Sequence, residues 1–214
     1  MNSPAMCPTT NEPLFPLLNC SRLRIGSDGI GVTTLIAGAG CPLDCRWCIN
    51  NRLLREAPSR PVTAEELYDL VKIDDLYFQA TGGGVTFGGG ESLLHAAFIK
   101  RFKELLPAEW KINAETSLAV PQNLLQEAID AVDLFIVDCK DMNPAIYQKY
   151  TGSAGTMMKN NLRYLAETID PEKVYIRIPL IPQYNTEEDR QNSLAELREM
   201  GFTRFDLFEY IQKE

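Results

Sequence analysis

Residues 32–48 read Val-Thr-Thr-Leu-Ile-Ala-Gly-Ala-Gly-Cys-Pro-Leu-Asp-Cys-Arg-Trp-Cys, an apolar run followed closely by three cysteines. The β-branched residues over 32–37 are typical of a buried strand. Cys41, Cys45 and Cys48 form a C-x3-C-x2-C group that lacks a nearby fourth ligand. Iron–sulfur clusters held by four cysteines mostly carry electrons, whereas three cysteines leave one iron open. The stretch therefore predicts a strand that leads into a metal site with an open position.

Two plainer interpretations of the cysteine group are a zinc site and an electron-carrier cluster. Structural zinc is almost always four-coordinate, usually with two separated pairs of ligands. The other cysteines are Cys7, Cys20 and Cys139, and the only histidine is His95. None forms a second pair, which favours the open cluster while both alternatives stay possible. His95 lies in the apolar helical pattern over 93–98, so we interpret it as a packing residue.

Length and composition indicate a globular protein with a core of its own. The chain has 214 residues, of which 45% are hydrophobic, and no linker-like change in composition divides it. We expect an N-terminal extension over 1–20 and a single domain over 21–214. The formal net charge of −8 argues against a nucleic-acid or membrane surface. Without a long apolar stretch or a signal-peptide pattern, a cytoplasmic location is expected, where thiols stay reduced.

Strand and helix patterns alternate along the chain. Short apolar or alternating runs predict six strands, at 32–37, 84–87, 110–115, 134–139, 174–178 and 204–208. Helical patterns lie between them, at 63–79, 92–106, 121–131, 156–168 and 186–200. This order predicts an α/β fold with a parallel sheet, either doubly wound or an open partial barrel, because a full barrel has eight units. In both architectures ligands bind at the carboxyl ends of the strands.

A glycine-rich run over 81–92 surrounds and follows the second predicted strand. It ends in Gly89, Gly90 and Glu91, followed by Ser92. Such a run is either a flexible turn or a loop whose backbone approaches a ligand closely.

Charged residues follow the third and fourth predicted strands. Glu115 and Thr116 end the third, and Asp138, Cys139 and Lys140 end the fourth. Because side chains alternate along a strand, Asp138 and Lys140 share one face while Cys139 points to the other. The acid and the lysine form either a solvated pair or part of a ligand site.

The cysteine group resembles the C-x3-C-x-aromatic-C signature of radical S-adenosylmethionine (SAM) enzymes, with Trp47 in the aromatic place. The resemblance implies a partial (β/α)6 barrel, a [4Fe–4S] cluster on Cys41, Cys45 and Cys48, and SAM at the open iron. It also implies reductive cleavage of SAM to methionine and a 5′-deoxyadenosyl radical.

Further motifs are similar to those of glycyl-radical enzyme activating enzymes, of the pyruvate formate-lyase activating type. Residues 27–31, 88–91, 137–142 and 175–182 follow in that family's order. The resemblance implies that the radical removes a hydrogen atom from a glycine of a partner enzyme, under anaerobic conditions and without a side chain as base. Two alternatives are a radical SAM enzyme for a small molecule or peptide and a non-catalytic metal or electron-transfer module.

Many activating enzymes carry a cysteine-rich, ferredoxin-like insertion after the first cluster motif. No cysteine lies between Cys48 and Cys139 in this chain. The resemblance therefore implies a minimal version with one cluster, reduced by an external flavodoxin-like or ferredoxin-like donor.

The resemblance assigns several side chains to SAM. Gly89, Gly90 and Glu91 match the motif that binds the SAM amino group. Lys140 and Arg177 match positions that contact the SAM carboxylate and ribose region. For Arg177 the alternative is a surface charge on a strand.

Trp47 and Asn50 match the stretch near the adenine, although a core tryptophan would suit position 47 nearly as well. Glu115, Thr116 and Asp138 match positions that hold a monovalent cation beside the SAM carboxylate. The family usually has aspartate at the place of Glu115, so the longer side chain leaves the cation and its identity open.

Overall fold

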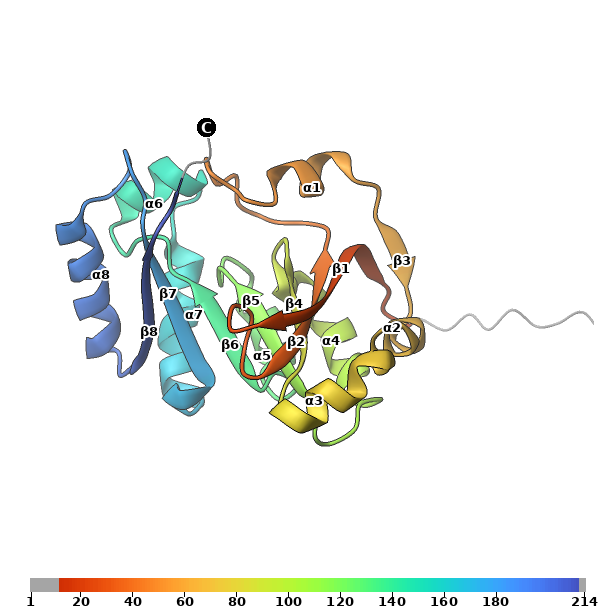
Figure 1. Ribbon diagram of the computed structural model, residues 1–214. Coiled ribbons are helices and arrows are strands. Elements are labelled where there is room, and N and C mark those ends of the chain that lie inside the picture. The colour runs from red at the N-terminus through yellow and green to blue at the C-terminus, as the bar shows by residue number, and fades with distance from the viewer. Residues whose placement is uncertain (1–11, 212–214) are drawn as a thin grey trace, which may run out of the picture.

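The computed structural model describes residues 12–211. At its centre lies one eight-stranded sheet with the order β3-β1-β2-β4-β5-β6-β7-β8 (Figure 1). The strands are β1 (Phe15–Ile25), β2 (Val32–Gly38), β3 (Arg60–Val62), β4 (Gly84–Gly89), β5 (Lys111–Thr116), β6 (Leu134–Asp138), β7 (Val174–Leu180) and β8 (Arg204–Glu209).

Six strands run parallel to one another and lie side by side in chain order. They are β2, β4, β5, β6, β7 and β8. They are the six strands that the sequence predicts. A doubly wound sheet reverses its strand order at a switch point. Since no reversal occurs, the partial (β/α)6 barrel is confirmed and the doubly wound alternative is wrong.

The helices connect the parallel strands and cover the outer face of the sheet (Figure 1). They are α1 (Asn51–Glu56), α2 (Ala64–Val71), α3 (Asp75–Thr81), α4 (Ala96–Lys103), α5 (Gln122–Ala128), α6 (Pro144–Thr151), α7 (Thr156–Thr168) and α8 (Glu187–Glu199). Short 3-10 turns are η1 (Lys72–Asp74), η2 (Ser92–His95) and η3 (Pro171–Lys173). Local sequence fixes helix starts: Thr63 and Glu66 form a reciprocal capping box at α2. Among residues 12–211, no helix is long and apolar enough to cross a membrane.

β1 and β3 add an antiparallel edge that the sequence does not predict. β1 pairs with β2 on one side and with β3 on the other. Its pairing with β2 shifts register twice, and Leu23 has a φ of 56°. β1 spans the expected boundary between the extension over 1–20 and the domain over 21–214. Residues 15–20, which the sequence assigns to the extension, therefore lie in the sheet.

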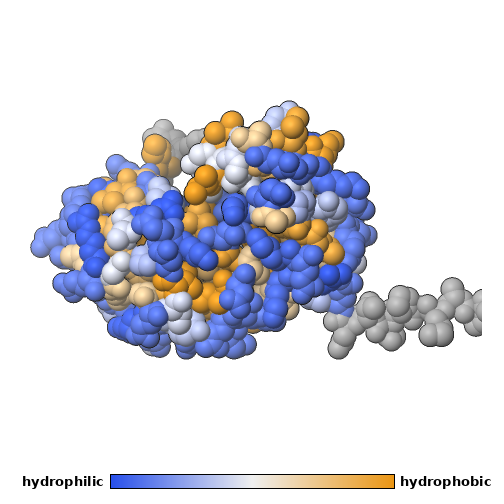
Figure 2. Space-filling model, turned by 90° about the horizontal axis from the view of Figure 1, so that it is seen from below, coloured by the Kyte–Doolittle hydropathy of each residue, from blue (hydrophilic) through white to orange (hydrophobic). Residues whose placement is uncertain are grey.

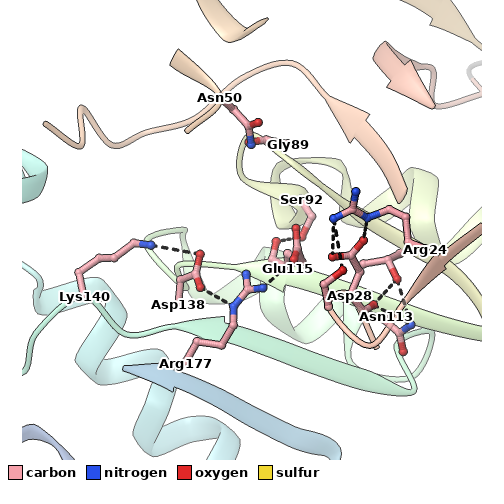
Figure 3. Close-up of polar contacts among 12 residues, drawn as sticks. Arg24, Asp28, Asn50, Gly89, Ser92, Asn113, Glu115, Asp138, Lys140 and Arg177 are labelled. Carbon is pink, nitrogen blue, oxygen red and sulfur yellow. Dashed lines mark hydrogen bonds and ion pairs between the residues drawn. The ribbon is translucent and has the colours of Figure 1, made fainter. Parts of the chain in front are cut away.

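The turn between β1 and β2 packs into the sheet at β4 and β5. The carbonyl oxygen of Asp28 accepts hydrogen bonds from Thr86 Oγ1 at 2.5 Å and from Asn113 Nδ2 at 3.4 Å. A Cβ at Gly29 would lie 2.3 Å from Asn113 Nδ2, so only glycine fits there. The carboxylate of Asp28 pairs with Arg24 (Figure 3).

The surface seen from below is mostly hydrophilic, with apolar side chains gathered in its middle (Figure 2). The buried core lies between the sheet and its helices. Trp110, Phe87 and Phe102 are among its largest side chains and are fully buried. This core holds the strands in register and so fixes where their carboxyl ends meet.

Candidate active site

The loop over residues 40–48, here called the Cys loop, follows β2 directly. Cys41, Cys45 and Cys48 line one cavity of about 180 Å3. The loop is tied to α6 by two backbone hydrogen bonds, from Asp44 N to the Thr151 carbonyl at 2.9 Å and from Arg46 N to the Tyr150 carbonyl at 3.0 Å. The sequence motif is thus held against the body of the barrel.

Three thiols on one loop are a donor set that fits a [4Fe–4S] cluster with one open iron. All three cysteines are free thiols. Burial raises the pKa of Cys45 to about 11, so the free thiol is protonated at neutral pH and must lose its proton when iron binds.

The glycine-rich loop after β4 lies beside the Cys loop. Gly90 N donates to the Gly38 carbonyl at 3.1 Å, and Glu91 N donates to the Gly40 carbonyl at 2.8 Å. A Cβ at Gly90 would lie 2.0 Å from the Gly40 oxygen, so this approach requires glycine. The glycine-rich run is therefore a loop fixed against the Cys loop by backbone contacts and not a flexible turn.

Asn50 joins the two loops from the start of α1. Its Nδ2 donates to the Gly89 carbonyl at 2.8 Å (Figure 3). Trp47 is half-buried and meets the ring of Tyr184 edge-on, with centroids 5.8 Å apart. Its carbonyl accepts a hydrogen bond from the Tyr150 hydroxyl at 3.4 Å. Both residues expected near the adenine thus lie on or beside the Cys loop.

The carboxylate of Glu91 is buried and occupied by neighbours. It accepts hydrogen bonds from Thr116 Oγ1 at 2.5 Å, Ser117 Oγ at 2.6 Å, Ser117 N at 2.8 Å and Leu93 N at 3.2 Å. Burial raises the pKa of Glu91, and the hydrogen bonds from Ser117 and Thr116 oppose that rise. The side chain fastens the glycine-rich loop to the end of β5.

Four charged side chains form a row across β5, β6 and β7. This charged row consists of Glu115, Asp138, Lys140 and Arg177 (Figure 3). Arg177 lies between the carboxylates, with Nη1 2.9 Å from Glu115 Oε1 and Nε 2.7 Å from Asp138 Oδ1. Lys140 Nζ is 3.1 Å from Asp138 Oδ2 and donates to the Tyr210 hydroxyl at 2.8 Å.

Strand register explains this row. Asp138 is paired directly with Arg177, and Glu115 is paired with Ile136 on the strand between. Cross-strand partners and alternate residues share a face, so the four side chains meet on one side of the sheet. Arg177 is 18% exposed on its side chain, so it is not a surface charge. Cys139 is fully buried in the core, as predicted.

The carboxylates of the charged row differ in their pKa values: burial raises the pKa of Glu115, and Arg177 opposes that rise. Burial raises the pKa of Asp138, but Lys140 and Arg177 lower it further, so it stays below its ordinary value. Burial lowers the pKa of Lys140, while Asp138 and Tyr210 raise it well above its ordinary value. Both therefore carry their charges at neutral pH.

His95 has a structural role. Its Nε2 donates to the Ala39 carbonyl at 2.9 Å, and its ring packs edge-on against Phe15. Burial lowers its pKa, which keeps the ring neutral. The packing role expected from the sequence is confirmed, and no histidine reaches the charged row.

Ser117 and Tyr210 contribute to the site without having been assigned to it by sequence reasoning. Each is a polar residue that directly follows a strand, β5 or β8. That position is the signal that could have found them, because the carboxyl ends of parallel strands meet at one edge.

Comparisons with known proteins agree with this geometry. Residues 35–206 match the model of the radical SAM superfamily. The chain is 33% identical over 145 residues to the (2S)-3-sulfopropanediol dehydratase activating enzyme of Klebsiella oxytoca, covering 66% of this chain but only 45% of that enzyme. It is 30% identical over 195 residues to the pyruvate formate-lyase-activating enzyme of Staphylococcus aureus, covering 86% of this chain and 77% of that enzyme.

Among solved structures, SuiB of Streptococcus suis bound to S-adenosylmethionine has the same fold, with a TM-score of 0.58 at 14% identity. The match covers 80% of this chain and 37% of SuiB. The matched family region contains the Cys loop, the glycine-rich loop and the charged row. The protein therefore belongs to the radical SAM superfamily, and its cofactors are a [4Fe–4S] cluster and SAM.

Proposed function

We propose that this protein activates a glycyl-radical enzyme. The observation that carries the proposal is that the Cys loop, the glycine-rich loop and the charged row meet at the carboxyl ends of the strands. Relatives named as activating enzymes match over 66% and 86% of the chain. With SAM bound, the reduced cluster would supply one electron, and SAM would split into methionine and a 5′-deoxyadenosyl radical. By taking a hydrogen atom from a glycine Cα of the partner, that radical would become 5′-deoxyadenosine.

The chain's own residues bind and orient. Cys41, Cys45 and Cys48 would hold the cluster, and with three thiolates one iron would stay open for SAM. The backbone of Gly89 and Gly90 accepts from the SAM amine. The Glu91 carboxylate keeps this backbone in place because Thr116 and Ser117 hold it.

Further contacts position the rest of SAM. Lys140 and Arg177, both charged and mostly buried, pair with the carboxylate and ribose region. Trp47 and Asn50 line the adenine side of the Cys loop. The proposal needs no side chain as an acid or a base.

Electrons come from an external flavodoxin-like or ferredoxin-like donor in this proposal. The other described cysteines are away from the Cys loop, with Cys139 in the core and Cys20 in β1. Cys7 lies outside the described residues. We propose an anaerobic, cytoplasmic setting because a thiolate-bound cluster persists where thiols stay reduced.

Electron paramagnetic resonance tests the proposal. The reconstituted, reduced protein is incubated with SAM and a candidate glycyl-radical enzyme from its own genome. The expected result is a glycyl radical doublet on the partner, together with one 5′-deoxyadenosine for each radical formed. The matched control, Cys45→Ala, should bind no cluster and give neither product.

Other outcomes identify the competing functions. Formation of 5′-deoxyadenosine without a glycyl radical on any candidate would favour a small-molecule or peptide substrate. A cluster whose spectrum does not change on adding SAM would favour an electron-transfer module. Turnover retained in Cys45→Ala would contradict the ligand role of that cysteine.

A further inference from the structure

The charged side chains of the row form ion pairs with one another. Arg177 bridges Glu115 and Asp138 at 2.9 and 2.7 Å (Figure 3). Lys140 lies 3.1 Å from the second oxygen of Asp138. Two carboxylates and two cations face one another, so the formal charges of the row cancel without an added ion.

Thr116, the third side chain that the family resemblance assigns to a monovalent cation, is engaged elsewhere. Its hydroxyl donates to Glu91 Oε1 at 2.5 Å and accepts from Leu118 N at 2.9 Å. Glu115 faces the opposite side of β5 because side chains alternate along a strand. The hydroxyl and the two carboxylates therefore do not surround a common point.

The length of residue 115 accounts for the bridge. Glutamate is one methylene longer than the aspartate usual in the resembling family, and it reaches the guanidinium two strands away. Its other oxygen, Oε2, packs against Gly88, where a Cβ would lie only 2.5 Å from it. Both Glu115 and Arg177 are 18% exposed on their side chains, so water screens the pair weakly.

We propose that the bridge from Glu115 through Arg177 to Asp138 takes the place of the monovalent cation in this protein, because it engages both carboxylates that would hold the ion, so that SAM binds without Na+ or K+. Arg177 keeps its contact with SAM, and the longer Glu115 in place of the family's aspartate is what brings the guanidinium between the two carboxylates. Burial lowers the pKa of Arg177, but Asp138 and Glu115 raise it further, so the guanidinium stays charged. The inference rests on SAM binding within the proposed function and not on the glycyl-radical step.

The first test needs only the wild-type, cluster-loaded protein. SAM affinity is measured by anaerobic calorimetry in NaCl, KCl and tetramethylammonium chloride at equal ionic strength, and sodium binding is followed by the NMR relaxation of sodium ions. We expect affinities within about twofold of one another and no saturable sodium site. An affinity about tenfold lower in tetramethylammonium, or saturable sodium binding, would overturn the inference.

Two variants then remove or weaken the bridge between Glu115, Arg177 and Asp138. In Arg177→Met the two carboxylates lose their shared partner, so SAM should bind about tenfold more weakly in tetramethylammonium and recover in NaCl or KCl. Glu115→Asp keeps every charge of the row but shortens the side chain, so that the carboxylate no longer reaches Arg177. It should show the same salt dependence, and it replaces Arg177→Met in the test if that variant fails to fold. Weakened binding that neither salt restores would contradict the replacement.

A matched control removes a different arginine among carboxylates. Arg101 contacts Glu12, Glu65 and Glu104, on the α4 side of the molecule. Arg101→Met should keep wild-type SAM affinity in all three salts. A wild-type protein that binds no SAM in any salt would overturn the proposed function, whereas SAM binding that requires Na+ or K+ would overturn this inference alone.

Discussion

Glu91 illustrates how one buried side chain can hold two segments of a site together. It is 2% exposed, and four donors from three residues point at its two oxygens. A buried carboxylate is tolerated only where such donors replace water. The family motif marks this glutamate as part of the site, and its contacts show that the carboxylate holds the glycine-rich loop against residues 116 and 117.

Glu91→Gln should destabilise the apo protein by about 2 kcal/mol, because an amide NH2 group would face a donor that now meets an oxygen. The backbone N–H of Ser117 cannot turn away, and the Thr116 hydroxyl already accepts from Leu118 N. The free energy of unfolding in urea at pH 7 measures the change.

The control for this variant is Glu56→Gln, at an exposed residue of α1 whose side chain is 67% exposed. It should change the free energy of unfolding by no more than about 0.5 kcal/mol. Equal stability of wild type and Glu91→Gln would show that the hydrogen bonds to Glu91 contribute little.

Asp74 connects the 3-10 turn η1 to the strands β1 and β2. Its side chain is fully buried, and it accepts hydrogen bonds from Arg22 of β1 and from Thr34 Oγ1 of β2, the latter at 2.7 Å. Burial raises its pKa, but the hydrogen bonds from Arg22 and Thr34 lower it more, so the folded value lies below 3.8. This link joins the antiparallel edge to the barrel.

Asp74→Asn should therefore cost about 2 kcal/mol of unfolding free energy at neutral pH. A carboxyl whose pKa is lowered by folding stabilises fully above its unfolded pKa and loses that effect as the pH falls through the folded value. The difference from wild type should thus be largest near neutral pH and shrink below about pH 4. Urea unfolding of the apo proteins across this range measures it.

Asp69→Asn is the matched surface control. Asp69 pairs with Lys72 across one turn, and its side chain is 67% exposed. This variant should lose no more than about 0.5 kcal/mol at any pH. A stability gap for Asp74→Asn that stays constant down to acid pH would mean that the ionised carboxylate is not the stabilising form.

The elements that the sequence predicts are those with a clear period and a buried face. The run over 32–37 and the other five core strands meet that condition. β1 does not, since its bulges interrupt the alternation, and β3 is a three-residue strand containing Pro61. α1 buries no residue at all. Edge strands and short surface helices depend on tertiary contacts that no local pattern records.

The same limit applies to the site. Strand ends place Glu115, Asp138 and Lys140 at one edge of the sheet from sequence alone, and the contacts bear this out. The bridge by Arg177 depends on the register of three strands, and the contact of Thr116 with Glu91 depends on how the glycine-rich loop folds back. Neither register nor loop path follows from residue type.

For the whole molecule, the cysteine positions decide how many clusters the fold can hold. The cavity beside β2 gathers Cys41, Cys45 and Cys48, while the described Cys20 and Cys139 lie in β1 and in the core. A second cluster would need its own group of thiolates. In the proposed function, a single cluster therefore leaves its reduction to an outside electron donor.

Anaerobic reconstitution should therefore give about four iron atoms per chain. Replacing Cys7, Cys20 and Cys139 together by alanine should leave that ratio and the visible spectrum unchanged, because none of the three is assigned to the Cys loop. Cys45→Ala should lose the iron. Colorimetric iron and sulfide analysis measures both ratios. About eight iron atoms per chain, or loss of iron in the triple variant, would mean that these cysteines hold a second cluster and that the chain could pass electrons to its own SAM site.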